Sequence, residues 1–270
     1  MPPLDIGPPV QTLLRRLAAL LVASLALSSF PAPHPAAASW PDSTPDLEGR
    51  WAHKLVETSV SNMPLVPKTT SRTVSYLLVD LRQEGDDLQL VTDTCEVEID
   101  NQTRLVETIL PPAFVRAIPD YVRNGRIVRE DGETSVEIDR QLLVLGARLR
   151  VPHSEWLPTE PDDPRVFDQD DDGHPGMTVV MDGILSGKVY LVQRGWDAMK
   201  GSVHSEDRIS GPVRWDVDHS VLGATSIFLR KMPDMKTIDG EPESYFELTR
   251  IPDDADCRDI LKNKSNWFQR

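Results

Sequence analysis

The stretch Val91-Thr92-Asp93-Thr94-Cys95-Glu96-Val97-Glu98-Ile99 alternates apolar and polar side chains, and it decides the fold class. Val91, Cys95, Val97 and Ile99 fall on one parity, with Asp93 as the exception, and threonine and glutamate fall on the other. A period of two predicts a β-strand with one buried and one solvated face. We therefore expect the four apolar residues to share the buried face.

Similar short patterns recur along the chain at residues 72–81, 105–110, 135–149, 177–181, 188–193, 202–209, 212–217, 221–229 and 244–251. Turn-forming pairs separate many of them, at residues 85–86, 124–125, 131–132, 186–187, 210–211 and 239–240. The pattern predicts an all-β domain over residues 39–252, built as a single antiparallel barrel or sandwich. A proline-rich segment at residues 152–164 interrupts it, either as a long loop or as a linker between two lobes; the length of the domain favours the loop.

After Pro252 the period changes from two to three and four, which predicts an amphipathic helix over residues 253–270. Asp253 or Asp254 can cap its N-terminus. The apolar stripe consists of Cys257, Ile260, Leu261, Lys264, Trp267 and Phe268.

Residues 1–38 fit a secretory signal peptide. Arg15 and Arg16 precede a short apolar run, and Ala36-Ala37-Ala38 offers a cleavage site before Ser39. The run is shorter than the roughly 20 apolar residues that a bilayer span needs, and no later segment comes close. We therefore expect an exported protein, periplasmic or secreted, without a transmembrane segment.

The net charge of −14 argues against nucleic acid as a partner, because an acidic surface repels phosphate. The two cysteines, Cys95 and Cys257, both follow the expected cleavage site. Pairing is favoured in an oxidising compartment, so we expect one disulfide that joins the C-terminal helix to an early strand. Two buried free thiols are the alternative.

The segment Asp168-Gln169-Asp170-Asp171-Asp172-Gly173-His174-Pro175-Gly176 predicts a calcium loop. Asp168, Asp170 and Asp172 occupy the first, third and fifth positions of a D-x-D-x-D-G pattern, and Gly173 supplies the sharp turn. The backbone carbonyl of His174 falls at the seventh position, where such loops use a main-chain oxygen. The alternative is an acidic surface loop in which the glycines and proline serve only the turn.

This loop departs from the helix-loop-helix calcium motif, because Val179 stands where a bidentate glutamate belongs and a strand follows at once. Further ligands would have to come from water or from one of the other nearby acids, Glu160, Asp162, Asp163, Asp171 and Asp182. We expect weak binding of Ca²⁺, with a Kd on the order of 10⁻⁴ to 10⁻³ M.

No sequence pattern identifies a catalytic residue. The strained G-x-S-x-G elbow of serine hydrolases is absent. Two H-x-E pairs, His153 with Glu155 and His204 with Glu206, could contribute to a zinc site, but surface pairs are the commoner explanation.

Gly49-Arg50-Trp51 resembles the G-x-W opening of lipocalin-like barrels, in which the tryptophan closes one end beneath an arginine of the last strand. Arg250 stands where that arginine would be, so the resemblance implies that Arg250 stacks on Trp51. The chain departs from lipocalins in its length and its acidic loop. A core tryptophan at the start of a strand is the other interpretation.

The acidic loop, with Thr178-Val179 and residues 187–194 after it, resembles a group of exported bacterial proteins that share a D-x-D-x-D-G-x-P-G loop. This resemblance implies export and a metal-binding loop, and it implies no activity. We expect a binding or structural protein, with an unidentified ligand or envelope partner, rather than an enzyme. The alternative is a calcium-dependent extracellular hydrolase.

Overall fold

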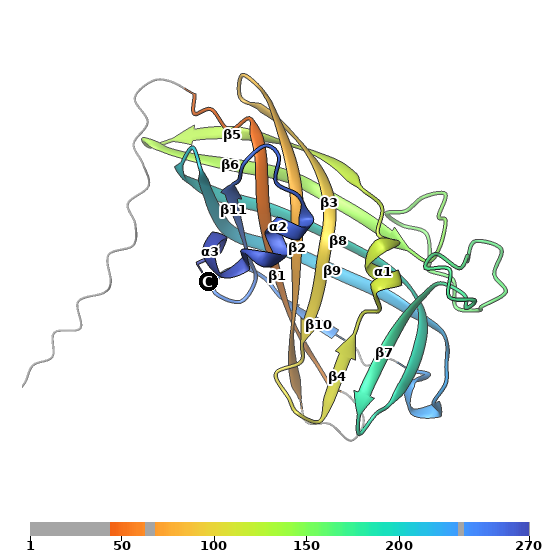
Figure 1. Cartoon of the computed structure of the whole chain (residues 1–270). Coiled ribbons are helices and arrows are strands. Elements are labelled where there is room, and N and C mark those ends of the chain that lie inside the picture. The colour runs from red at the N-terminus through yellow and green to blue at the C-terminus, as the bar shows by residue number, and fades with distance from the viewer. Residues whose placement is uncertain (1–43, 63–67, 232–234, 270) are drawn as a thin grey trace, which may run out of the picture. The chain divides into compact units, whose positions relative to one another are not determined.

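The computed structural model describes residues 44–62, 68–231 and 235–269 (Figure 1). The expected signal peptide, residues 1–38, lies outside the described residues. The described strands form one sheet in which all named strands pair antiparallel, and this confirms the all-β class. In chain order they are β1 (Gly49–Ser61), β2 (Thr69–Glu84), β3 (Asp87–Asp100), β4 (Val106–Ile109), β5 (Tyr121–Glu130), β6 (Glu133–Leu145), β7 (Met177–Gly183), β8 (Gly187–Ser205), β9 (Arg208–Ala224), β10 (Met235–Ile238) and β11 (Tyr245–Arg250).

Eight of these strands, β1, β2, β3, β5, β6, β8, β9 and β11, pair in a closed ring. Each is hydrogen-bonded to the next in chain order, and β11 pairs with both β9 and β1. The shorter β4 and β10 extend the sheet beside β7 and β1, and β7 itself pairs with one end of β8. The sheet therefore wraps round its own interior, and of the two expected forms the ring of pairs corresponds to the barrel.

A β-bulge in β3 changes which residues of that strand face the interior. Tyr76 of β2 pairs with Glu96, but the adjacent Leu77 pairs with Thr94, so Cys95 is an extra residue in the ladder. An extra residue shifts the side-chain alternation by one position. Before the bulge the even-numbered residues of β3 face inward, and after it the odd-numbered residues do.

The predicted common face of Val91, Cys95, Val97 and Ile99 is wrong for this reason. Before the bulge the buried residues are Leu88, Leu90 and Thr92. After it, Val97 and Ile99 line the interior. Val91 and Cys95 lie on the outer face, where Cys95 packs among residues of the C-terminal segment.

The C-terminal segment forms two short helices instead of one, α2 (Cys257–Lys262) and α3 (Lys264–Trp267), which meet at Asn263. The N-cap of α2 is Asp256, a little beyond the two predicted aspartates. Its side chain accepts the backbone N–H of Asp259, and the Asp259 side chain accepts that of Asp256, which completes a capping box. No helix among the described residues is long and apolar enough to cross a membrane.

These helices cover the outer face of the sheet (Figure 1). The predicted disulfide is confirmed, because Cys95 of β3 is bonded to Cys257 of α2. Lys264 of α3 forms ion pairs with Glu96 and Glu98 of β3. Apolar packing beneath the helices involves Ala52, Tyr76, Leu78, Ile251, Ala255, Ile260, Trp267 and Phe268. The segment is thus fixed to the sheet by covalent, ionic and apolar contacts.

Two of the predicted turns are wrong, because Asn124-Gly125 lies inside β5 and Ser210-Gly211 lies inside β9. A Cβ atom on Gly125 would stand 2.8 Å from the carbonyl oxygen of Glu137, and one on Gly211 would stand 2.3 Å from that of Lys200. Glycine at these positions permits close approach of the neighbouring strand, which is its other common use within sheets.

The proline-rich segment at residues 152–164 is part of the connection between β6 and β7. Both strands belong to the same sheet, so the segment is a loop and does not link separate lobes. Two other short elements lie outside the ring of strands, α1 (Pro112–Arg116) and the 3-10 helix η1 (Ile227–Leu229).

Two apolar clusters fill the interior from opposite ends. The first lies inside the ring, around Trp51, Phe246 and Leu248. The second lies among α1, β7 and β8, around Phe114, Met177 and Leu191. Residues of both clusters, Leu77 and Trp215 of the first and Phe114 and Leu191 of the second among them, line a common cavity. The two clusters therefore leave a space between them.

Candidate functional site

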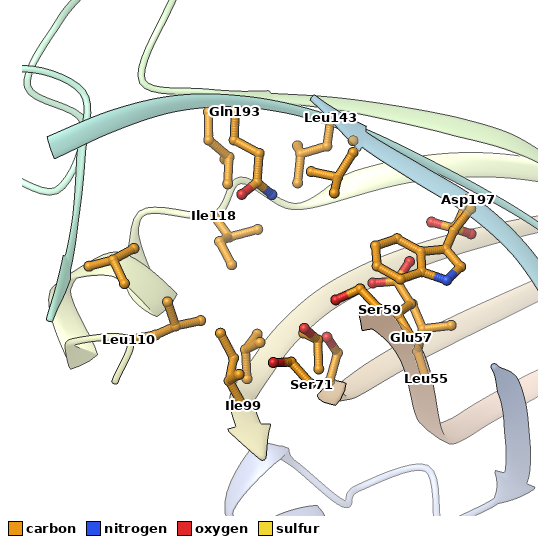
Figure 2. Close-up of a pocket in the computed structure, with 18 of the residues that line it drawn as sticks. Leu55, Glu57, Ser59, Ser71, Ile99, Leu110, Ile118, Leu143, Gln193 and Asp197 are labelled. Atoms are coloured by element: carbon orange, nitrogen blue, oxygen red, sulfur yellow. The ribbon is translucent and has the colours of Figure 1, made fainter. Parts of the chain in front are cut away.

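The interior of the sheet contains a cavity of about 280 Å³. This is close to the lower end of the range for sites that hold small molecules. Figure 2 shows side chains converging on it from strands on several sides. Its walls include Leu55, Glu57, Ser59 and Ser61 of β1, Ser71, Thr73, Ser75 and Leu77 of β2, Thr94, Val97 and Ile99 of β3, Leu110, Phe114 and Ile118 at α1, Leu143 and Leu145 of β6, Val179 and Met181 of β7, Gln193 and Asp197 of β8, and Trp215 and Val217 of β9.

The lining differs between the two ends of the cavity. In Figure 2, Leu110 and Ile118 lie at one end, and Glu57 and Asp197 lie at the other. Hydroxyl side chains of β1 and β2, such as Ser59 and Ser71, occupy the wall near the carboxylates. The cavity can therefore accommodate a molecule that is apolar at one end and polar at the other.

A buried ion pair stands behind the polar end. Arg123 of β5 donates to a carboxylate oxygen of Asp197 at 2.6 Å and to the backbone oxygen of Asp139 at 2.9 Å. The Arg123 side chain is 2% exposed, and its Nε and Nη1 atoms have no hydrogen-bond partner among the described residues. Arg123 is thus held in place by Asp197 and does not itself line the cavity.

Glu57 is the second carboxyl group at this end. Burial, followed by the negative charge of Asp197, raises its pKa to about 8, and the positive charge of Arg123 opposes the rise. The Glu57 side chain is partly buried, and it lines the cavity. At neutral pH the Glu57 carboxyl therefore holds a proton for most of the time.

Two further titratable side chains near the ion pair are uncharged at neutral pH. Burial, helped by the charge of Arg123, lowers the pKa of His53 to about 3. Burial also raises the pKa of Tyr121 well above its ordinary value. The charge at this end of the cavity therefore depends on Glu57, Arg123 and Asp197.

Sequence patterns did not reveal this cluster. Its members come from β1, β5 and β8, which are far apart in the chain, and none belongs to a motif. One local signal was present: Glu57 shares the parity of Trp51 and Leu55, which belong to the apolar cluster inside the ring. A carboxyl group on the inward-facing parity of a strand is unusual enough to mark a site.

Trp51 is fully buried in the apolar cluster inside the ring of strands. The guanidinium carbon of Arg250 lies 4.8 Å from the centre of the Trp51 ring, which confirms the predicted stacking. Trp215 lies on the cavity wall, and its indole N–H donates to the hydroxyl of Ser244. Trp196 instead stacks with Arg140, an exposed residue. The aromatic lining of the cavity therefore includes Trp215, buried in the first cluster, and Trp196, whose ring stacks with Arg140, together with Phe114 and Tyr121.

The acidic loop brings three carboxylates together outside the cavity. Asp168, Asp170 and Asp172 each place one oxygen within 4.8 Å of the others, so the cluster could hold a metal ion. Backbone N–H groups shape the loop: Asp168 accepts those of Asp172 and Gly173, and Asp172 accepts that of His174. This coiling directs the alternate side chains toward one point.

Asp170 is the buried member of the cluster, at 7% exposure. One of its oxygens accepts the N–H of Thr178 at 3.0 Å, and the other, Oδ1, has no partner among the described residues. Burial raises its pKa, and the charges of Asp172 and Asp168 add to the rise. A buried carboxylate oxygen without a donor is costly, and a cation would relieve that cost.

His174 contributes no side-chain ligand to this cluster. Its ring stacks on Tyr190, with the two ring centres 4.1 Å apart. That the backbone carbonyl of His174 is a ligand of the cation stays a prediction. Of the other acids considered as ligands, Asp163 is paired with Arg165.

The two H-x-E pairs do not form a metal group within the described part of the chain. Glu155 is paired with Arg165, and the His204 ring lies 2.9 Å from the hydroxyl of Ser210. Both observations fit the surface interpretation of these pairs.

No protein-family model, no curated protein and no solved structure matches this chain. What the protein binds has therefore to be inferred from the chemistry of the cavity and of the acidic loop.

Proposed function

We propose that this protein is a binding protein that holds a small amphipathic molecule inside its closed sheet. The observation that carries the proposal is the internal cavity, with an apolar end at Leu110 and Ile118 and a polar end at Glu57 and Asp197. Ligand sites commonly combine a mainly apolar wall with a few placed polar groups. Burial of an apolar chain there contributes about 25 cal/mol for each Å² removed from water.

The dimensions of the cavity argue against the alternative of a polymer hydrolase. A space of about 280 Å³ can hold a small molecule, but it does not offer the open groove that a polymer needs. The three clustered aspartates of the acidic loop are not among the cavity-lining residues, so an ion bound there would not act on a substrate in the cavity. A purely structural role is less well supported, because the interior is not filled.

A fluorescent apolar probe, N-phenyl-1-naphthylamine, tests the proposal. We expect saturable enhancement of its fluorescence by the protein. Ser75→Trp, on the cavity wall, should weaken probe binding at least tenfold, because the indole takes up much of the space. Ser154→Trp is the matched control, since Ser154 is exposed on the β6–β7 loop.

The melting temperature of each variant is measured alongside, so that lost folding is not mistaken for lost binding. Equal probe binding by the wild type and a folded Ser75→Trp variant, or no saturable binding by the wild type, would contradict the proposal.

We also propose that the acidic loop binds Ca²⁺ and is stiffened by it. The support is the buried, unpartnered Oδ1 of Asp170 between two other carboxylates. Export to a calcium-rich compartment belongs to the same proposal, and the Cys95–Cys257 disulfide supports it, because such bonds persist where conditions are oxidising.

A further inference from the structure

We propose that the cavity selects amphiphiles with a cationic amine head over carboxylic acids of the same chain length, through Glu57 and Asp197. This inference rests on the proposed binding function and specifies its ligand class. It follows from the arrangement of charges at the polar end of the cavity.

The first step concerns the partners of the two carboxyl groups. Asp197 is neutralised by Arg123 at 2.6 Å. Glu57 has no hydrogen bond and no ion pair with any residue that the structure describes. It lines the cavity at the same end as Asp197. A ligand that enters the cavity therefore meets a carboxyl group that lacks a cation of its own.

The second step is a survey of the other charged groups around Glu57. His53, on the same strand, is neutral, and so is Tyr121 on β5. Asp216 of β9 is the third carboxylate among the lining residues; it is exposed, and one of its oxygens accepts the N–H of Val217.

The remaining lining side chains are uncharged, from β2 and β3 through α1, β6 and β7 to β10. When both Glu57 and Asp197 are ionised, these two carboxylates and Arg123 together carry one net negative charge, which an ammonium group would neutralise. The exposed carboxylate of Asp216 adds to the negative charge of the lining.

The third step excludes a fatty acid as the preferred ligand. A carboxylate head could avoid repulsion by Glu57 only while Glu57 keeps its proton, and the negative charge of Asp197 would still repel it in a poorly solvated space. Arg123 cannot compensate, because it is 2% exposed, does not line the cavity and is already bound to Asp197. With an ammonium head at Glu57, by contrast, the alkyl chain can extend toward Leu110 and Ile118 at the apolar end.

The proton on Glu57 gives this arrangement a thermodynamic signature. With a pKa of about 8 in the empty protein, Glu57 must lose its proton before it can pair with an ammonium ion. Below pH 8, amine binding should therefore release about one proton, and the affinity should rise roughly tenfold for each pH unit. A neutral ligand has no reason to show this dependence.

The test is isothermal calorimetry with three ligands of equal chain length, decylamine, decanol and decanoate, at pH 7. We expect the wild type to bind decylamine at least tenfold more tightly than decanoate. In Glu57→Gln the amine should lose at least tenfold in affinity, whereas decanol should change less than threefold. The amine affinity of the wild type, measured from pH 6 to pH 8, should rise, and that of Glu57→Gln should not.

The outcomes separate this inference from the function on which it rests. If decanol or decanoate binds but decylamine binds no more tightly than decanoate, the amine preference is wrong and the binding function stands. If the amine affinity is insensitive to Glu57→Gln and to pH, the role assigned to Glu57 is wrong. If none of the three ligands binds, both the preference and the binding function are refuted.

Discussion

Arg250 stands directly opposite Trp51 in the β1–β11 ladder, and its guanidinium group lies over the indole ring. The same guanidinium donates to the backbone oxygens of Asp46, Glu48 and Glu206. One side chain therefore joins the segment before β1, the β8–β9 turn and the last strand.

Arg250→Ala should destabilise the protein by about 1 to 3 kcal/mol, because it removes a cation–π contact and several charge-assisted hydrogen bonds. Arg126→Ala is the control: Arg126 is also paired, with Glu137, but it is 66% exposed, and its loss should cost less than about 0.5 kcal/mol. Urea denaturation of both variants measures the difference. Equal losses would show that the Arg250 contacts contribute no more than a surface ion pair.

Reduction of the Cys95–Cys257 bond should lower the free energy of unfolding by about 2 to 5 kcal/mol, because the bond closes a loop of 162 residues in the unfolded chain. The measurement is thermal melting with and without reductant. A variant with serine at both positions should melt at the lower temperature under both conditions. A reductant effect on that variant would mean that the destabilisation does not come from this disulfide.

Glu57 should make the protein less stable as the pH rises from 4.5 to 8. Between its ordinary pKa of 4.5 and its folded pKa of about 8, the folded protein keeps a proton that the unfolded chain has released. The free energy of unfolding therefore falls through this window, and the stability is fully present only below pH 4.5.

Glu57→Gln should remove this contribution, so the variant should gain stability relative to the wild type between pH 6 and pH 8.5, as measured by urea denaturation. Glu107→Gln, an exposed carboxyl on β4, serves as the control and should show no such relative gain. A parallel pH dependence of the wild type and Glu57→Gln would contradict the assignment.

Calcium at about ten times its Kd should stabilise the wild type by roughly 1.4 kcal/mol, a rise of about 3 to 5 °C in melting temperature. Asp170→Asn should abolish this rise, because it removes the buried ligand of the cluster. Asp171→Asn is a close control, since Asp171 is exposed, lies outside the cluster and has a φ of 54°, which asparagine also adopts. A calcium effect that survives Asp170→Asn would rule out this site.

The features that sequence predicted are those encoded locally or by a strong pairing preference. Alternation predicted the all-β class, the presence of only two cysteines in a chain expected to be exported predicted the disulfide, and spacing predicted that Asp168, Asp170 and Asp172 converge. The G-x-W resemblance predicted the contact between Arg250 and Trp51. Each of these predictions depends either on a pattern within one segment of the chain or on a pair of residues that the sequence itself identifies.

The features that sequence missed depend on how distant strands pair. The bulge at Cys95 is a property of the β2–β3 ladder, and nothing in β3 alone indicates that Val97 turns inward while Cys95 turns outward. The same holds for Glu57, whose environment is created by Arg123 and Asp197 on two other strands. The pairing of distant strands determines which way these side chains point and what surrounds them, and the alternation within one strand does not contain that information.

Because Cys95 and Cys257 are covalently joined, a protease that cuts one peptide bond anywhere between them leaves both fragments on one molecule. The β6–β7 loop, where Trp156 is 88% exposed, is a natural position for such a cut. The nicked protein would migrate as a single band on a non-reducing gel and as two bands after reduction. Its fragments would also stay joined through the strand pairs on either side of the cut, so the protein could persist as a mature two-chain species.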